Sequence, residues 1–121
     1  MKIYLAGPIE GTTWRIKVEK FFKEFKNVEI FNPRRFEIKG MNHYDLINLD
    51  LQYILRSDIV LANITRLSAG TSMELVYSRQ FKKETHLICK KALLSPWHLG
   101  HSDFVYSDLQ KALTVLKENC K

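Results

Sequence analysis

The feature that most constrains the fold is a strand–loop–helix pattern over residues 57–75. Ile59-Val60-Leu61-Ala62 is an uninterrupted apolar run, which is typical of a strand buried on both faces of a parallel sheet. A loop of small residues, Ser68-Ala69-Gly70-Thr71-Ser72, follows, and a helical pattern then carries Glu74 in its first turn. Ligands of open α/β proteins bind where such loops leave the sheet, so Glu74 is either a helix cap or a reactive group.

The rest of the chain repeats this alternation of strands and helices. Strands are expected at residues 3–6, 28–31, 59–62, 85–89 and 104–106. Helices are expected from a cap at residue 12 or 13 to residue 25, over 44–56, from the small-residue loop to about residue 83, and after a cap at residue 107 or 108. Residues 34–42 and 90–103 are expected to be irregular. The 121 residues therefore predict one α/β domain over 1–121, a flavodoxin-like or Rossmann-like fold whose five-stranded parallel sheet has the order 2-1-3-4-5 and helices on both faces.

This strand order places the loop after Ala6 and the loop after Ile64 in one crevice. Gly7, in the first of these loops, would let a ligand approach the backbone closely. Tyr4 lies in the strand that pairs with residues 59–62, so its hydroxyl could reach Glu74 from the core.

Each candidate side chain has a structural alternative. Thr71-Ser72-Met73-Glu74 matches a capping box, in which the glutamate only satisfies the helix N-terminus. The functional alternative is a nucleophile that the helix dipole keeps ionised. Asp50 lies at the edge of the apolar stripe of its helix, so it either points to water or carries a function. Tyr4 could simply fill the core.

The net charge of +6 comes from 19 Lys and Arg against 13 Asp and Glu. The basic residues are dispersed, and Lys17, Lys20, Lys23 and Lys26 recur on an outward helix face. They form no patch with interleaved aromatic residues, which argues against a polynucleotide partner, although the charge could steer small anions.

Other function classes lack their sequence signals. No apolar run approaches the ~20 residues of a membrane span, and Met1 leads straight into a strand, so we expect a cytoplasmic protein with Cys89 and Cys120 reduced. The histidines show no zinc spacing, and neither a dinucleotide fingerprint nor a Walker loop is present. No metal or organic cofactor is expected.

Four segments carry a resemblance to a known family. They are Ile3-Tyr4-Leu5-Ala6-Gly7-Pro8-Ile9, Asp50-Leu51 with Ile54, Ser57-Asp58-Ile59-Val60-Leu61-Ala62, and Ser68-Ala69-Gly70-Thr71-Ser72-Met73-Glu74-Leu75. In order and spacing they resemble the nucleoside 2-deoxyribosyltransferase family, which includes nucleoside 5'-monophosphate N-glycosidases. The resemblance extends over nearly the whole chain.

The resemblance implies a role for each candidate. Glu74 would attack C1' of the sugar and form a covalent glycosyl ester, Asp50 would assist departure or return of the base, and Tyr4 would orient the nucleophile. Ser68 and Gly70 would contact the 5' end of the sugar, and Ser95 would belong to a segment donated by a neighbouring subunit. The remaining substrate-binding candidates belong to the first loop and the helix that follows it: Gly7, Ile9, Trp14 and Arg15.

The reaction itself has open alternatives. Transfer of the deoxyribosyl group of a nucleoside to another free nucleobase is the first. Hydrolysis of a nucleoside 5'-monophosphate is the second, which Arg15 and Arg66 favour and Glu10 opposes. A non-catalytic nucleotide-binding module is the third. Because the crevice is open near residues 95–98, we expect a homodimer or a larger assembly with a shared site.

Overall fold

The computed structural model describes residues 1–8 and 13–120. Its strands are β1 (Lys2–Ala6), β2 (Glu29–Phe31), β3 (Ile59–Ile64), β4 (Glu84–Cys89) and β5 (Phe104–Tyr106). Its helices are α1 (Trp14–Phe22), α2 (Pro33–Phe36), α3 (His43–Arg56), α4 (Ala69–Gln80), α5 (Pro96–Gly100) and α6 (Leu109–Asn119), with a 3₁₀ turn η1 (Lys91–Leu93). The predicted alternation of strands and helices is confirmed.

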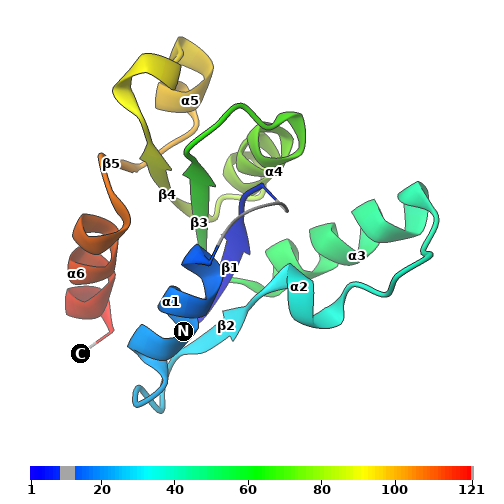
Figure 1. Cartoon of the computed structure of the whole chain (residues 1–121), viewed down its shortest axis with the longest axis horizontal. Helices are drawn as coiled ribbons and strands as arrows, with labels where there is room; N and C mark the ends of the chain where they lie inside the picture. Colours follow the sequence, from blue (N-terminus) through cyan, green and yellow to red (C-terminus); the bar gives the residue numbers. More distant parts are fainter. Residues whose placement is uncertain (9–12, 121) are drawn as a thin grey trace.

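The five strands form one parallel sheet in the order β2-β1-β3-β4-β5 (Figure 1). β1 pairs with β3 so that Tyr4 lies opposite Val60, and β3 pairs with β4 so that Ala62 lies opposite Leu87. All six residues of β3 are buried, as its apolar run predicted, because it is the central strand and is covered on both faces. The predicted fold and strand order are therefore confirmed.

Helices cover both faces of the sheet. On one face α1 and α6 pack against Ile3 and Leu5 of β1. On the other face α3 and α4 contribute Ile54 and Leu75, which pack with Tyr4 and its neighbours in the sheet. Because side chains alternate along a strand, Tyr4 lies on the α3–α4 face while both of its neighbours lie on the other.

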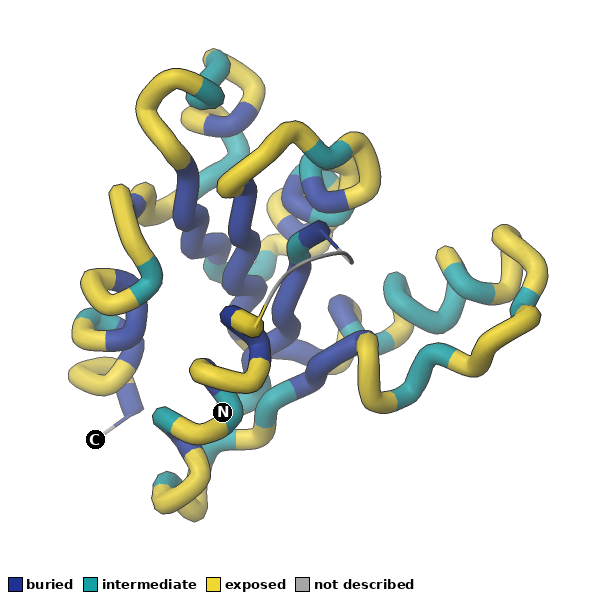
Figure 2. Tube along the Cα trace, in the orientation of Figure 1, coloured by how far each residue is buried: buried dark blue, intermediate teal, exposed yellow. Residues whose placement is uncertain are grey.

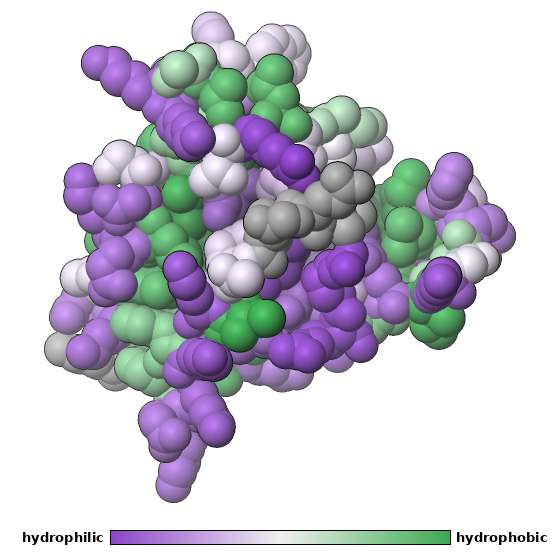
Figure 3. Space-filling view, in the orientation of Figure 1, coloured by the Kyte–Doolittle hydropathy of each residue, from purple (hydrophilic) through white to green (hydrophobic). Residues whose placement is uncertain are grey.

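The first half of α3 extends away from the sheet (Figures 1 and 2). Ile54 is the one buried residue of this 14-residue helix, whereas Tyr44 is 76% exposed and Ile47 is 56% exposed. The space-filling view shows hydrophobic surface on this projecting part (Figure 3). The inner side of α3 and the facing side of α4 line one cavity.

Two short helices occupy segments that the sequence predicted to be irregular. α2 begins at Pro33 behind Asn32, whose side chain accepts a hydrogen bond from the Arg34 amide. α5 begins at Pro96 behind Ser95, which forms a capping box with His98. A cap followed by proline favours a helix start, but helices of four and five residues are too short to show an apolar period.

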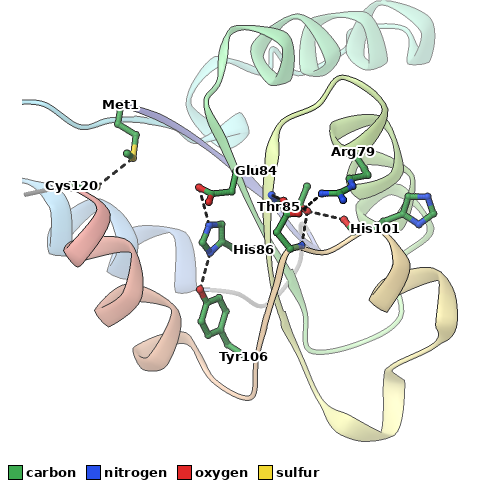
Figure 4. Close-up of polar contacts among 9 residues, drawn as sticks. Met1, Arg79, Glu84, Thr85, His86, His101, Tyr106 and Cys120 are labelled. Carbon is green, nitrogen blue, oxygen red and sulfur yellow. Dashed lines mark hydrogen bonds and ion pairs between the residues drawn. The ribbon is translucent and has the colours of Figure 1, made fainter.

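A separate set of polar contacts fastens the edge strand (Figure 4). The Asp103 carboxylate accepts a hydrogen bond from the Thr85 amide at 2.8 Å and pairs with Arg79. Nδ1 of His86, which is fully buried, lies 2.8 Å from the Tyr106 hydroxyl. These contacts hold β5 on β4. In the described part of the chain, no helix is both long and apolar enough to span a bilayer.

Candidate active site

A cavity of about 640 Å³ opens at the carboxyl ends of β1 and β3. The loop after β1 contributes Gly7 and Pro8, and the loop after β3 contributes Arg66, Leu67 and Ser68. The two loops that the strand order places in one crevice therefore do line one cavity. Its volume is in the range of small-molecule sites, and α3 and α4 form its walls.

Glu74 lies in the second turn of α4 and does not cap the helix. Ser68 is the N-cap: its backbone is extended, and its hydroxyl accepts a hydrogen bond from the Thr71 amide at 3.3 Å. The helix thus begins at Ala69, which makes Thr71 the third helical residue and Glu74 the sixth. The capping-box alternative for Glu74 is wrong, because Ser68 provides the cap in place of Thr71.

The Glu74 carboxyl lines the cavity, but one of its oxygens, Oε2, is inaccessible to solvent and has no hydrogen-bond partner within the described residues. Burial raises the pKa of Glu74 to about 7. The Tyr4 hydroxyl and the Arg15 charge oppose that rise in pKa, in that order. The helix dipole was expected to keep this group ionised, but its effect fades within one turn and Glu74 lies beyond it. Burial dominates instead.

Tyr4 faces Glu74 from beneath. Its side chain is fully buried, and its hydroxyl makes no hydrogen bond of ordinary length and angle within residues 1–8 and 13–120. It is nevertheless directed at Glu74 as a donor, which lowers the pKa of that carboxyl group. Burial raises the pKa of Tyr4 far above its ordinary value, and the charges of Glu74 and Asp50 add to the effect. The phenol is therefore neutral at any physiological pH and can donate its proton in a hydrogen bond to a carboxylate.

Asp50 reaches the same cavity from α3. It is half-buried, and its Oδ1 atom is inaccessible to solvent and lacks a partner within the described chain. Burial is the largest cause that raises the pKa of Asp50 to about 8, followed by the charge of Glu74 and then that of Glu37. The structure thus brings Tyr4, Asp50 and Glu74 together from three elements that are distant in sequence.

Arg15 lines the cavity near Glu74, but its guanidinium is largely committed to the first loop. Nη1 donates to the Pro8 carbonyl at 3.0 Å, and Nη2 donates to the Gly7 carbonyl at 2.7 Å. The side chain is 5% exposed, and burial lowers the pKa of Arg15 while the charge of Glu74 opposes this. Arg15 therefore holds the backbone after β1 in place and provides positive charge beside the carboxylates.

Gly7 lines the cavity for a reason that the sequence did not reveal. A Cβ atom at this position would lie 2.7 Å from Cζ2 of Trp14, so the indole ring occupies the space of a side chain. Trp14 is 6% exposed and belongs to the core between the sheet and α1. It is not among the residues that line the cavity. The structure therefore places Trp14 beneath the first loop as its packing support.

The other predicted residues are distributed unevenly. Ser68 and Gly70 line the cavity at the N-terminus of α4, where the first amides of a helix favour negative charge. Ser95 caps α5 and does not line the cavity of its own chain. Ile9 lies outside the described residues, as does Glu10.

Sequence reasoning missed one carboxylate and an apolar wall. Glu37 lines the cavity after α2, and Ile47, Met73 and Tyr77 form apolar surface around it. Asn32-Pro33 follows β2 just as Gly7-Pro8 follows β1, at the same edge of the sheet. This similarity could have indicated that the segment after β2, which contains Glu37, also borders the site. Within residues 1–8 and 13–120, no group of three or more His, Cys, Asp or Glu side chains is arranged to hold a metal ion.

The fold and the cavity define an α/β protein of the Rossmann-like class, with carboxyl groups gathered at the switch point of its sheet. A sequence profile described as "Nucleoside 2-deoxyribosyltransferase like" matches residues 1–93. The chain belongs to this family, as the resemblance predicted. A search of curated proteins found no match.

Several solved structures share the fold. A 2-deoxyribosyltransferase from Bacillus psychrosaccharolyticus is 21% identical, with a TM-score of 0.78 over 93% of this chain and 90% of that one. A conserved protein from Enterococcus faecalis V583 is 16% identical, with a TM-score of 0.83 over 98% of each chain. A CMP N-glycosidase from Clostridium botulinum is 22% identical, with a TM-score of 0.73 over 98% of this chain and 99% of that one. At these identities the likeness establishes the shared fold.

Proposed function

We propose that the protein cleaves the N-glycosidic bond of a nucleoside or nucleotide through a covalent glycosyl-Glu74 intermediate. The observation that carries this proposal is the pairing of Glu74 and Asp50 in one cavity with raised pKa values of about 7 and about 8. Near neutral pH the first can be an ionised nucleophile while the second still holds a proton, which is the division of roles that glycoside cleavage needs.

The proposed reaction has two displacements. In the first, a Glu74 carboxylate oxygen bonds to C1' of the sugar, the C1'–N bond breaks, and its electron pair leaves with the base nitrogen, which takes the proton of Asp50. In the second, an acceptor attacks C1', the ester bond breaks to restore the Glu74 carboxylate, and Asp50 takes the acceptor's proton. Configuration at C1' is retained, since it is inverted twice. Tyr4 orients Glu74 by donating its hydroxyl proton in a hydrogen bond.

The acceptor distinguishes two enzymes within this mechanism. With a free nucleobase as acceptor the protein is a deoxyribosyltransferase, which is our first proposal because it agrees with the description of the family. With water as acceptor and a 5'-monophosphate as substrate it is an N-glycosidase. Two observations favour that second candidate: Arg34 and Arg66 line the cavity, and so does the N-terminus of α4 at Ser68 and Gly70.

A chromatographic assay separates these possibilities. One reaction contains a deoxynucleoside and a different free base, and the other contains a panel of nucleoside 5'-monophosphates. A new deoxynucleoside in the first supports transfer, and free base released only in the second supports hydrolysis. Glu74→Gln should abolish either activity while substrate binding persists. Full activity of this variant would refute the mechanism, and ligand binding without turnover by the wild type would identify a binding module.

We also propose that the protein is a homodimer or a larger assembly with a shared site. Exposed apolar side chains surround the cavity mouth on both walls, with Ile47 on α3 and Met73 on α4 56% and 59% exposed. Burying such a patch favours association. Ser95 does not line the cavity of its own chain, and we propose that the segment it begins contributes to the cavity of a second copy. Analytical ultracentrifugation tests this proposal, and an active protein that sediments only as a monomer would refute it.

A further inference from the structure

We propose that Glu37 is a positioning residue for the proton donor: its carboxyl group pairs with that of Asp50, and the two hold one proton, which Asp50 delivers to the leaving base. This inference rests on the proposed function and adds a residue that the sequence analysis did not select. It concerns the inner wall of the cavity, where the segment after α2 faces α3.

The backbone of Glu37 is fixed by α2. Glu37 ends this short helix with an extended backbone, and its amide donates to the Pro33 carbonyl at 2.9 Å. The preceding residue, Phe36, stacks on Tyr53 of α3 with ring centroids 3.8 Å apart and planes 9° apart. Tyr53 lies one helical turn after Asp50. The stacked rings therefore anchor the Glu37 segment against the part of α3 that carries Asp50.

Glu37 and Asp50 line the same cavity, and a hydrogen bond with the Glu37 side chain is among the causes that raise the pKa of Asp50. A hydrogen bond between carboxyl groups requires a proton on one of them, because two carboxylates only accept hydrogen bonds and repel each other. Asp50 is the partner that loses more by ionising, since its Oδ1 atom is inaccessible to solvent and receives no hydrogen bond from a donor group within the described residues. The shared proton therefore belongs chiefly to Asp50.

The other charged and titratable groups that act on Asp50 do not remove this proton. Glu74 on α4 raises the pKa of Asp50, as Glu37 does, and the Arg15 charge has the smallest effect and opposes them. Tyr4 on β1 is neutral. Arg34 and Arg66 also line the cavity.

Glu37 matters because it affects the two catalytic carboxyl groups unequally. It raises the pKa of Asp50 by its charge and by the hydrogen bond, whereas for Glu74 its charge is the smallest of the acting causes. It therefore widens the interval between the two pKa values. Within that interval the nucleophile is ionised and the donor is protonated, so the leaving base receives its proton as the C1'–N bond breaks.

Glu37→Gln tests the proposal, because glutamine keeps the shape of glutamate but removes its charge and can donate its amide protons to an Asp50 carboxylate. Carbon-13 NMR of protein labelled at the aspartate carboxyl carbons follows Asp50 directly, with Asp50→Asn assigning its signal. We expect the Asp50 midpoint to move about one pH unit or more towards acid in Glu37→Gln. Glu29→Gln removes the same charge from an exposed position at the start of β2 and should leave the midpoint unchanged.

The pH dependence of turnover connects the pair to catalysis. In Glu37→Gln the alkaline limb of the kcat/KM profile should move towards acid together with the Asp50 midpoint. An Asp50 midpoint that does not move in Glu37→Gln overturns the inference, whether or not the protein turns over a substrate. A midpoint that moves while the alkaline limb stays in place overturns the catalytic role. A third outcome is that the Asp50 midpoint moves in Glu37→Gln but the wild type cleaves no nucleoside or nucleotide. That outcome refutes the proposed function and still supports the pairing of the two carboxyl groups.

Discussion

Replacing Glu74 by glutamine should make the folded protein more stable at neutral pH while it removes the proposed nucleophile. Glu74 is half-buried, and its Oε2 atom is inaccessible to solvent and has no hydrogen-bond partner in the described part of the chain, so its negative charge is poorly solvated in the folded state. Glutamine has nearly the same shape and carries no charge. The Glu74 carboxylate that the proposed reaction needs therefore destabilises the fold at neutral pH.

The size and sign of this change in stability follow from the linkage between proton binding and folding. The pKa of Glu74 rises from an ordinary 4.5 in the unfolded chain to about 7 in the folded one. Between these values the folded protein holds a proton that the unfolded chain has released, so stability falls as the pH rises. At about 1.36 kcal/mol per pH unit, the cost reaches about 3 kcal/mol above pH 7 and vanishes below the unfolded pKa. Glutamine does not ionise, so the Glu74→Gln variant does not lose this stability as the pH rises.

Urea denaturation of wild type and Glu74→Gln at pH 4 and pH 8 measures the effect. The difference in unfolding free energy between the two proteins should grow by about 3 kcal/mol in favour of the variant from pH 4 to pH 8. Comparing the two pH values cancels the cost of burying the glutamine amide. Glu29→Gln, at an exposed site, should show no such growth. A difference that is independent of pH would refute the assignment of Glu74 as a desolvated carboxylate.

Two further predictions concern the pH dependence and the loop after β1. The pH profile of kcat/KM should be bell-shaped with limbs near pH 7 and pH 8, because Glu74 must lose its proton and Asp50 must keep its own. Measuring kcat/KM from pH 5 to 10 tests this prediction. A flat profile would contradict it. Gly7→Ala should lower the unfolding free energy by about 1–3 kcal/mol, since the new methyl group would lie 2.7 Å from Cζ2 of Trp14. Gly70→Ala is the control: its new methyl group would meet no atom within 4 Å, and the position lies in a helix. It should therefore be neutral or stabilising by up to about 1 kcal/mol. Urea denaturation measures both variants, and equal losses of stability in the two would contradict the packing argument.

Local patterns were sufficient for the sheet and for the principal carboxylates. The apolar run at 59–62 predicted a central strand, and alternation with helices led to the observed order β2-β1-β3-β4-β5. That order placed the loops after β1 and β3 in one crevice, so Glu74 could be selected from its position after β3. Asp50 could be selected because it lies at the edge of an apolar stripe. These inferences succeeded because strand period, helix period and connection rules are properties of the chain itself.

Local patterns misled where two motifs overlapped. Ser68 and Thr71 can both cap a helix, and the capping-box pattern selects Thr71, because Glu74 lies three residues after it. In the structure Ser68 adopts the extended backbone of an N-cap, and its hydroxyl accepts the hydrogen bond of the Thr71 amide. The choice depends on where the strand before it ends and how the new helix packs against the sheet.

The sequence by itself determined the alternation of elements, the order of the strands and the edge at which a ligand would bind, because these depend on hydrophobic period and chain connectivity. Only the tertiary structure decided the electrostatics. The pKa values of Glu74 and Asp50 depend on burial and on charges from Arg15 and Glu37, which belong to separate elements. Desolvation and Coulomb energy vary with distances in space, and no spacing along the chain encodes them.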